Sequence, residues 1–203
     1  QMDISKHPDR DVVVALIEKL RRIVFPGYFR DKNYHIYNAK HNLSMLIEDV
    51  MSHLTDQLSL VYQGTGEEEA AARKHAQQIA VEFFRQIPDV RAMVQTDLEA
   101  AYEGDPAATG MAEIIFAYPG LSAITVYRLA HVLYTLNVPM IPRSMTEHAH
   151  SITVRTLHLV SAVLHTAPEV AGTDDQADLN THPHALGNGV AELINNIEVQ
   201  SSV

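Results

Sequence analysis

The sequence predicts a mainly α protein, and three observations lead to that prediction. Apolar residues recur at three- and four-residue steps through most of the chain before residue 150, which is typical of helices with one buried face. No stretch before Ser151 shows the alternation of a β-strand. Glycine and proline residues separate the periodic segments. Together these patterns predict helices from about residue 10 to 137, and again near 142 to 150.

The first two helices have long apolar stripes. Residues 11–25, "DVVVALIEKLRRIVF", carry one such stripe, and "PGYF" ends the helix because Pro26 cannot donate a backbone hydrogen bond and Gly27 tolerates positive φ. Residues 38–62 carry a longer one, closed by Gly64 and Gly66. The predicted buried faces are Val13, Leu16, Ile17, Leu20, Ile23 and Val24 in the first helix, and Leu43, Leu46, Ile47, Val50, Met51, Leu54, Leu58 and Val61 in the second.

Two further helices are predicted on either side of Pro88. The acidic start of "GEEEAAARKHAQQIAVEFFRQI", residues 66–87, suits the positive end of a helix dipole. Pro88 should stop this helix and open the next one, residues 88–102, as a first-turn proline. The segment "EGDPAATG" then reads as an ordered loop. Another helix follows the "YPG" turn, with Leu121, Ile124, Leu129, Val132, Leu133 and Leu136 as its buried face.

The composition changes near His150, which predicts two parts: a helical domain, residues 1–150, and a divergent, partly disordered C-terminal segment, residues 151–203. The stretch "SITVRTLHLVSAVLH" is interpreted either as a β-rich segment or as one last short helix. The polar, turn-rich residues after it read as a loop or poorly ordered linker ahead of the apolar "VAELINNIEV".

Composition excludes several classes of function. The chain has 203 residues, of which 46% are hydrophobic and 20% charged, so it can bury a substantial core. No window reaches the roughly 18 consecutive apolar residues of a membrane span, and no apolar signal segment follows the N-terminus, so a cytoplasmic protein is predicted. The absence of cysteine excludes disulfides and thiolate sites. The net charge of -10 argues against a nucleic-acid partner.

Few residues suggest chemistry on their own. Asp105 lies between Gly104 and Pro106, where its short acidic side chain either caps a turn or points outward to bind a cation. Arg128 and His131 are three residues apart and so share a helix face. The pairs His148/His150 and His182/His184 lack a further ligand at recognisable spacing, so no metal site is predicted. No G-x-S-x-G nucleophile pattern is present.

Several consecutive strings resemble the serine O-acetyltransferase family, in its longer bacterial type with an extended helical N-terminal region. They are "DLEAAYEGDPAA", residues 97–108, "EIIFAYPGLSAITVYRLAHVLY", residues 113–134, "VPMIPR", residues 138–143, and "TEHAHS", residues 146–151. The strings are long and stand in the order of the family. With the looser match upstream, the resemblance covers about residues 10–151.

The resemblance implies an enzyme that transfers an acetyl group from acetyl-CoA to L-serine, the first step of cysteine biosynthesis. It implies a helical domain ahead of a left-handed β-helix of hexapeptide repeats, a homo-oligomer that is a trimer or a dimer of trimers, and cysteine synthase as a further partner. It implies acetyl-CoA as a co-substrate and no tightly bound cofactor. By this resemblance Asp105 binds the ammonium group of serine, for which a charge-assisted hydrogen bond is well suited.

The catalytic half of the family pattern is not recognisable after Ser151. When that pattern is laid on the chain without gaps, its aspartate falls on Thr156 and its Asp-His pair on Val170 and Ala171, which cannot accept a proton. His158 is then the nearest candidate for the general base. Only "ALGNGV", residues 185–190, resembles a hexapeptide, so the tail is at most a residual piece of the β-helix. Two hypotheses follow: a serine acetyltransferase, or a non-catalytic helical oligomerisation or interaction module derived from that family.

Overall fold

The computed structural model describes residues 7–29 and 39–166, and for residues 155–166 it describes the helical backbone alone. Six helices make up this part: α1 (Arg10–Val24), α2 (Ala39–Gly64), α3 (Glu69–Gly104), α4 (Met111–Ala117), α5 (Pro119–Thr135) and α6 (Ile141–Thr166). No strand occurs within those ranges. The predicted mainly α fold is confirmed.

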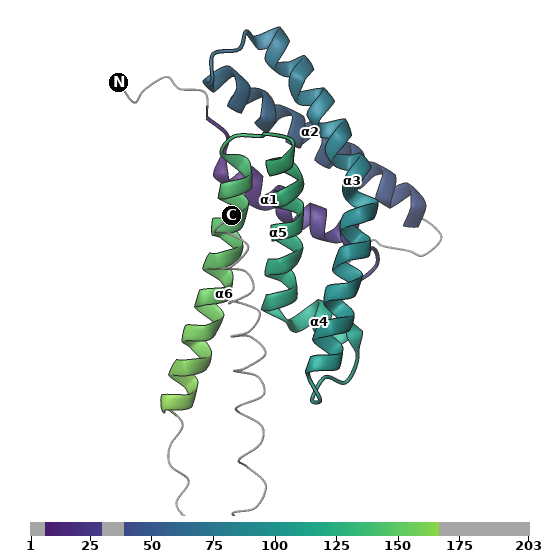
Figure 1. Ribbon diagram of the computed structural model, residues 1–203, viewed down its shortest axis with the longest axis vertical. Coiled ribbons are helices and arrows are strands. Elements are labelled where there is room, and N and C mark those ends of the chain that lie inside the picture. Colours follow the sequence, from purple (N-terminus) through teal and green to yellow (C-terminus); the bar gives the residue numbers. More distant parts are fainter. Residues whose placement is uncertain (1–6, 30–38, 167–203) are drawn as a thin grey trace, which may run out of the picture.

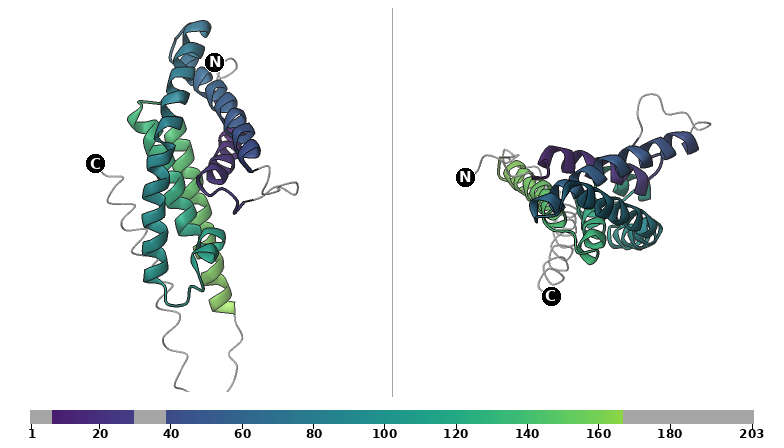
Figure 2. Two further views of the ribbon diagram at one scale, coloured as in Figure 1. Left: turned by 90° about the vertical axis from the view of Figure 1, so that its right-hand side faces the viewer. Right: turned by 90° about the horizontal axis from the view of Figure 1, so that it is seen from above.

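The helices form an elongated bundle (Figures 1 and 2). Helices α2 and α3 pack against each other as a hairpin at one end of it, and α5 and α6 pack side by side. The long α3 also packs against α5, and the short α4 joins these two helices at the opposite end (Figure 1). Helix α1 packs on α2 and α6. One continuous cluster of buried apolar side chains therefore receives residues from all six helices.

The predicted apolar stripes point into this cluster. All six residues of the first stripe are buried on α1. On α2, Val50, Leu54, Leu58 and Val61 of the stripe are buried, while Leu43, Leu46, Ile47 and Met51 are partly buried. Asp9 caps α1, since its carboxylate accepts hydrogen bonds from the backbone N–H groups of Asp11 and Val12. Helix α3 begins where the acidic cluster predicts, with Glu68 as its N-cap.

Pro88 does not end a helix, and this corrects the prediction of two helices on either side of it. Helix α3 runs for 36 residues through Pro88. An interior proline costs a helix about 3 kcal/mol. Burial of each large apolar side chain contributes about 1.5–3 kcal/mol, and four of them, Phe83, Ile87, Val90 and Val94, are buried on the same face across the proline. Their combined contribution exceeds the cost of the proline.

Helix α4 is absent from the sequence-based expectation, which placed only a loop and one helix between residues 103 and 135. The chain forms this seven-residue helix directly after the predicted loop, and α5 then starts at Pro119 in its first turn. At the far end of α5, Asn137 has a φ of 58°, a left-handed conformation that asparagine tolerates well. The chain reverses there and enters α6.

Helix α6 is longer than predicted, and it shows that "SITVRTLHLVSAVLH" is helical and not β-rich. Residues 151–166 continue the helix that begins at Ile141, so this stretch contains no residual β-helix. The helix crosses residue 150, where the sequence suggests a boundary, and the division into two domains stays a prediction. The proposed linker, "ALGNGV" and His182/His184 lie outside the described residues. None of the described helices combines the length and the hydropathy that a membrane span requires.

Candidate functional site

Asp105 lies at the C-terminal end of α3, in a region that we call the corner: the last two turns of α3, the loop 105–110, α4 and the first turns of α5. Its Oδ1 accepts a hydrogen bond from the backbone N–H of Ala107 at 2.9 Å, and its Oδ2 accepts one from the Tyr118 hydroxyl at 2.6 Å. The backbone carbonyl of Asp105 accepts from the N–H of Ala108. The structural expectation for Asp105, a carboxylate that caps a turn, is therefore confirmed.

The Tyr118 hydroxyl brings two segments of the corner together across 13 positions of sequence. Its hydrogen bond to the Asp105 carboxylate, with burial as a smaller cause, raises the pKa of Tyr118 to about 12. The hydroxyl therefore keeps its proton at neutral pH and remains a donor. Sequence reasoning missed this contact, because "YPG" reads there only as a turn. A tyrosine directly before a helix-opening proline is the one local signal.

The loop between α3 and α4 is fixed by a second carboxylate. Glu113 accepts hydrogen bonds from the backbone N–H and the hydroxyl of Thr109, at 2.8 and 2.6 Å. The hydroxyl bond, with the backbone bond second, lowers the pKa of Glu113. Because Glu113 is in the first turn of α4, its ionised side chain also suits the helix dipole. The loop that carries Asp105 is thus held at both ends.

An ion pair joins α3 to α5 above this loop. The guanidinium of Arg128 contacts both carboxylate oxygens of Asp97, with Nε and Nη2 each 2.5 Å from an oxygen. The Asp97 side chain is 16% exposed and that of Arg128 is 31% exposed. The hydrogen bond to Asp97 raises the pKa of Arg128. Asp97 is eight residues before Asp105, and Arg128 is ten residues after Tyr118. The Asp97–Arg128 ion pair and the Asp105–Tyr118 hydrogen bond therefore connect α3 to α5 at two places.

The other residues that the sequence singled out in the described part of the chain lie outside the corner, on α5 and α6. His131 is exposed on α5, where its ring stacks on Tyr134. His148 and His150 lie on α6, half-buried and exposed respectively, and helical geometry turns side chains two positions apart away from each other. His158 is also on α6, at a position where the side chain is not described. No group of three or more metal-ligating side chains gathers among the residues whose side chains are described.

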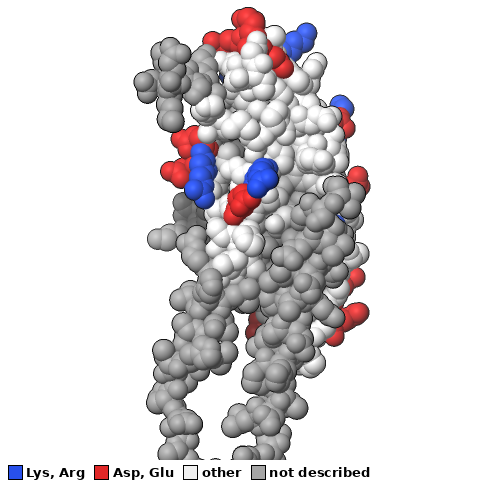
Figure 3. Space-filling model, turned by 60° about the vertical axis from the view of Figure 1, so that its left-hand side comes forward, with Lys and Arg blue, Asp and Glu red and all other residues white. Residues whose placement is uncertain are grey.

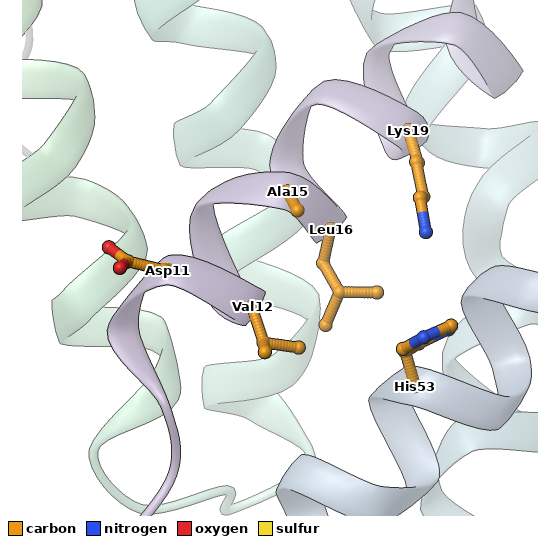
Figure 4. Close-up of a pocket in the computed structure, with 6 residues that line it drawn as sticks. All are labelled: Asp11, Val12, Ala15, Leu16, Lys19 and His53. Atoms are coloured by element: carbon orange, nitrogen blue, oxygen red, sulfur yellow. The ribbon is translucent and has the colours of Figure 1, made fainter.

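A separate groove lies between α1 and α2, away from the corner. It has a volume of about 300 Å³ and is lined by Asp11, Val12, Ala15, Leu16, Lys19 and His53 (Figure 4). Its basic groups have acidic neighbours: Lys19 contacts Asp49 at 2.6 Å, and His53 Nδ1 is 3.3 Å from the same carboxylate. The Lys19 bond is the main cause that lowers the pKa of Asp49. Asp11 points away from Lys19 and His53 (Figure 4), so the groove has no convergent set of polar groups.

Basic side chains do not gather into a patch on the face that Figure 3 shows. Among the described residues visible there, basic side chains lie beside acidic ones, and uncharged surface separates these groups (Figure 3). The basic stretch "EKLRR" of α1 follows this pattern, because Lys19 pairs with Asp49 and Arg21 with Glu18. Such pairs are typical of solvated helix faces. The corner is therefore the candidate site with the most specific geometry.

The chain is similar in sequence to one family of known proteins. Residues 38–126, which span all of α2, α3 and α4 and the first half of α5, match the family model described as "Serine acetyltransferase, N-terminal". Asp97, Asp105 and Tyr118 all lie inside this range. Arg128 lies two residues beyond it.

Individual relatives agree with the family model. A plasmid-encoded serine acetyltransferase of Synechococcus elongatus is 33% identical over 163 residues, covering 77% of this chain and 51% of the relative. A serine acetyltransferase of Synechocystis is 42% identical over 62 residues, covering 30% of this chain and 25% of the relative. The chain thus spans about half the length of the first relative and a quarter of the second.

Solved structures show the same relationship. The crystal structure of Entamoeba histolytica serine acetyltransferase 1 in complex with L-cysteine superposes with a TM-score of 0.56 at 29% identity, over 76% of this chain and 54% of that one. The native form of the same enzyme superposes with a TM-score of 0.55 at 30% identity, over 75% of this chain and 55% of that one. The helical fold is therefore shared with the corresponding part of these enzymes.

Proposed function

We propose that this chain, which belongs to the serine acetyltransferase family through its helical region, is the serine-binding helical part of an enzyme that transfers an acetyl group from acetyl-CoA to L-serine. In this proposal Asp105 accepts the ammonium group of L-serine, and acetyl-CoA is the co-substrate. His158 is the candidate for the general base that takes the proton of the serine hydroxyl.

One observation supports the proposal above the others: the carboxylate of Asp105 is fixed on both of its oxygens, in a loop that is itself fixed. A carboxylate that only caps a turn needs one such bond. Charged groups that select a ligand work best when they are held in place before the ligand arrives. The corner meets this requirement, and it lies within the region that matches the family.

The first experiment measures release of free CoA thiol from acetyl-CoA, with and without L-serine, by the 203-residue chain. The chain contains no cysteine, so the thiol readout has no background from the protein. Release that depends on L-serine would support the acetyltransferase, and His158→Ala should then abolish it. A folded chain that releases no thiol would contradict the acetyltransferase activity of this chain.

A second experiment tests the serine site without catalysis. Asp105→Asn removes the charge that the ammonium group needs, so titration calorimetry should show L-serine binding at least tenfold weaker than in the unmodified chain. Glu103→Gln is the matched control, because it removes an exposed carboxylate two residues away on the same end of α3 and should leave affinity unchanged. Equal affinity in all three proteins would contradict the role of Asp105.

A non-catalytic interaction module is the second candidate function, and exposed apolar side chains favour it. Phe116 is 77% exposed, Tyr134 65% and Met140 55%, and contact with a partner would remove this apolar surface from water. The proposed partners are further copies of this chain, as a trimer or a dimer of trimers, and cysteine synthase. Light scattering at high concentration tests this association, because a clean monomer would contradict the homo-oligomer.

A further inference from the structure

Tyr118 occupies a position that the chain fixes from both sides. Its backbone N–H donates to the carbonyl of Ile114 at the end of α4, and its own carbonyl accepts from the N–H of Ser122 in the first turn of α5. Pro119 follows it and fixes φ at the first position of α5. The backbone of Tyr118 is therefore part of two helix ends, so its side chain starts from a rigid point.

From this position the Tyr118 side chain donates a hydrogen bond to the Asp105 carboxylate. A carboxylate rotates easily about χ2 unless its oxygens are bound, because that torsion has broad energy wells. Here the Ala107 N–H binds Oδ1 at 2.9 Å and the Tyr118 hydroxyl binds Oδ2 at 2.6 Å. The N–H of Ala107 belongs to the same loop as Asp105 and moves with it. The Tyr118 hydroxyl connects the carboxylate to a residue outside that loop, at the start of α5.

The ion pair between Asp97 and Arg128 supports the hydrogen bond between Tyr118 and Asp105. It holds α3 and α5 together within a few turns of Asp105 and Tyr118 respectively, through two parallel N–H···O bonds. Bidentate contacts of this kind fix orientation as well as distance. The hydroxyl of Tyr118 and the carboxylate of Asp105 are thus presented to each other by two helices that cannot slide independently.

We propose that Tyr118 is a positioning residue, which holds the Asp105 carboxylate in the orientation that receives the ammonium group of the amino-acid substrate. This inference rests on the proposed function, in which Asp105 binds L-serine. It assigns to Tyr118 no contact with the substrate and no proton transfer. Its hydroxyl acts through Asp105 alone.

The test is a comparison of L-serine binding in the full chain and its Tyr118→Phe variant by titration calorimetry. Phenylalanine keeps the ring and removes the hydroxyl, so affinity should fall about five- to tenfold, since a hydrogen bond to a charged group is lost. Tyr127→Phe is the matched control. Tyr127 is a half-buried tyrosine of α5, and its pKa is raised by burial and, as a smaller cause, by the carboxylate of Glu147. This control should bind L-serine as the unmodified chain does.

A double-mutant cycle separates positioning from a general loosening of the fold. If Tyr118 acts only through Asp105, the double variant Asp105→Asn/Tyr118→Phe should bind L-serine no more weakly than Asp105→Asn alone. Additive losses would overturn the inference, because they would mean that Tyr118 acts on binding by another route. Circular dichroism at the temperature of the titrations confirms that each variant is folded.

The outcomes also distinguish this inference from the proposed function. Weak binding by Asp105→Asn together with full affinity in Tyr118→Phe would overturn the role of Tyr118 and leave that of Asp105 standing. Full affinity in Asp105→Asn, or no L-serine binding by the unmodified chain, would overturn both.

Discussion

Along the α2–α3 hairpin the helices meet mainly through apolar side chains, whereas at the corner the connections between α3, α4 and α5 include hydrogen bonds and an ion pair. In the hairpin, Leu54, Leu58 and Phe83 are at most 2% exposed. At the corner, Asp97, Asp105 and Tyr118 are all partly exposed. Apolar contacts are non-directional and stabilise in proportion to the area buried. Polar contacts are directional, so they contribute less free energy but fix the orientation of particular groups.

This difference suggests a division of roles in the molecule. The hairpin should supply a larger part of the free energy of unfolding, and the corner should supply the geometry of one carboxylate. The two regions share α3 (Figure 1), whose first half belongs to the hairpin. The last turns of α3 carry Asp97 and lead into the loop that begins with Asp105. Substitutions in the two halves of this helix should therefore have different consequences.

The largest effect on stability is expected for Phe83→Ala in the hairpin. Phe83 is 0% exposed and packs edge-on against Phe84 at 5.7 Å between ring centroids. Its truncation should lower the free energy of unfolding by about 3–5 kcal/mol, measured by urea denaturation followed at 222 nm. Phe116→Ala at the corner is the matched control, because Phe116 is 77% exposed, and should change stability by no more than about 0.5 kcal/mol. Similar losses in both variants would contradict the comparison.

An intermediate effect is expected for Arg128→Met at the corner. Methionine keeps a long apolar side chain but leaves the Asp97 carboxylate, 16% exposed, without its partner. The free energy of unfolding should fall by about 1–3 kcal/mol. Arg128→Lys keeps the charge without the bidentate geometry and should recover only part of this loss. If Arg128→Met were as stable as the unmodified chain, the ion pair would not hold α3 to α5.

Helices α1 and α2 are the parts of the molecule that the sequence predicts best. Apolar periodicity alone identifies the buried faces of α1 and α2, because each helix buries one stripe and the spacing within a stripe is local information. The same reasoning fails at Pro88. There the local preference for a break is outweighed by burial of Phe83, Ile87, Val90 and Val94, and how deeply those side chains are buried depends on helices elsewhere in the chain.

At the corner the sequence identifies single residues but not their partners. The resemblance to the family singles out Asp105, and helical spacing places Arg128 on one face of α5. Neither indicates Tyr118 or Asp97 as the group each one binds, since these contacts span 13 and 31 positions. Such pairs depend on how α3, α4 and α5 are arranged in space. Helix α4 is missed for a different reason, because seven residues are too few for a periodic signal.

The smallest effect is expected at an ion pair of the hairpin, Arg73 with Asp56. Their side chains are 59% and 49% exposed, and the shortest contact is 3.2 Å through a single nitrogen. Water competes for both groups, so Arg73→Gln should lower the free energy of unfolding by about 0.5 kcal/mol or less. The loss should shrink further in 1 M salt, where exposed charges are screened within about 3 Å.

Arg128→Met, measured under the same two salt conditions, provides the contrast, because its less exposed pair should retain most of its effect. The two ion pairs both join α3 to another helix, yet only the one at the corner is bidentate and largely shielded from water. A loss at Arg73 as large as that at Arg128 would mean that exposure does not decide what these pairs contribute. The division between an apolar hairpin and a polar corner would then not describe how this molecule is stabilised.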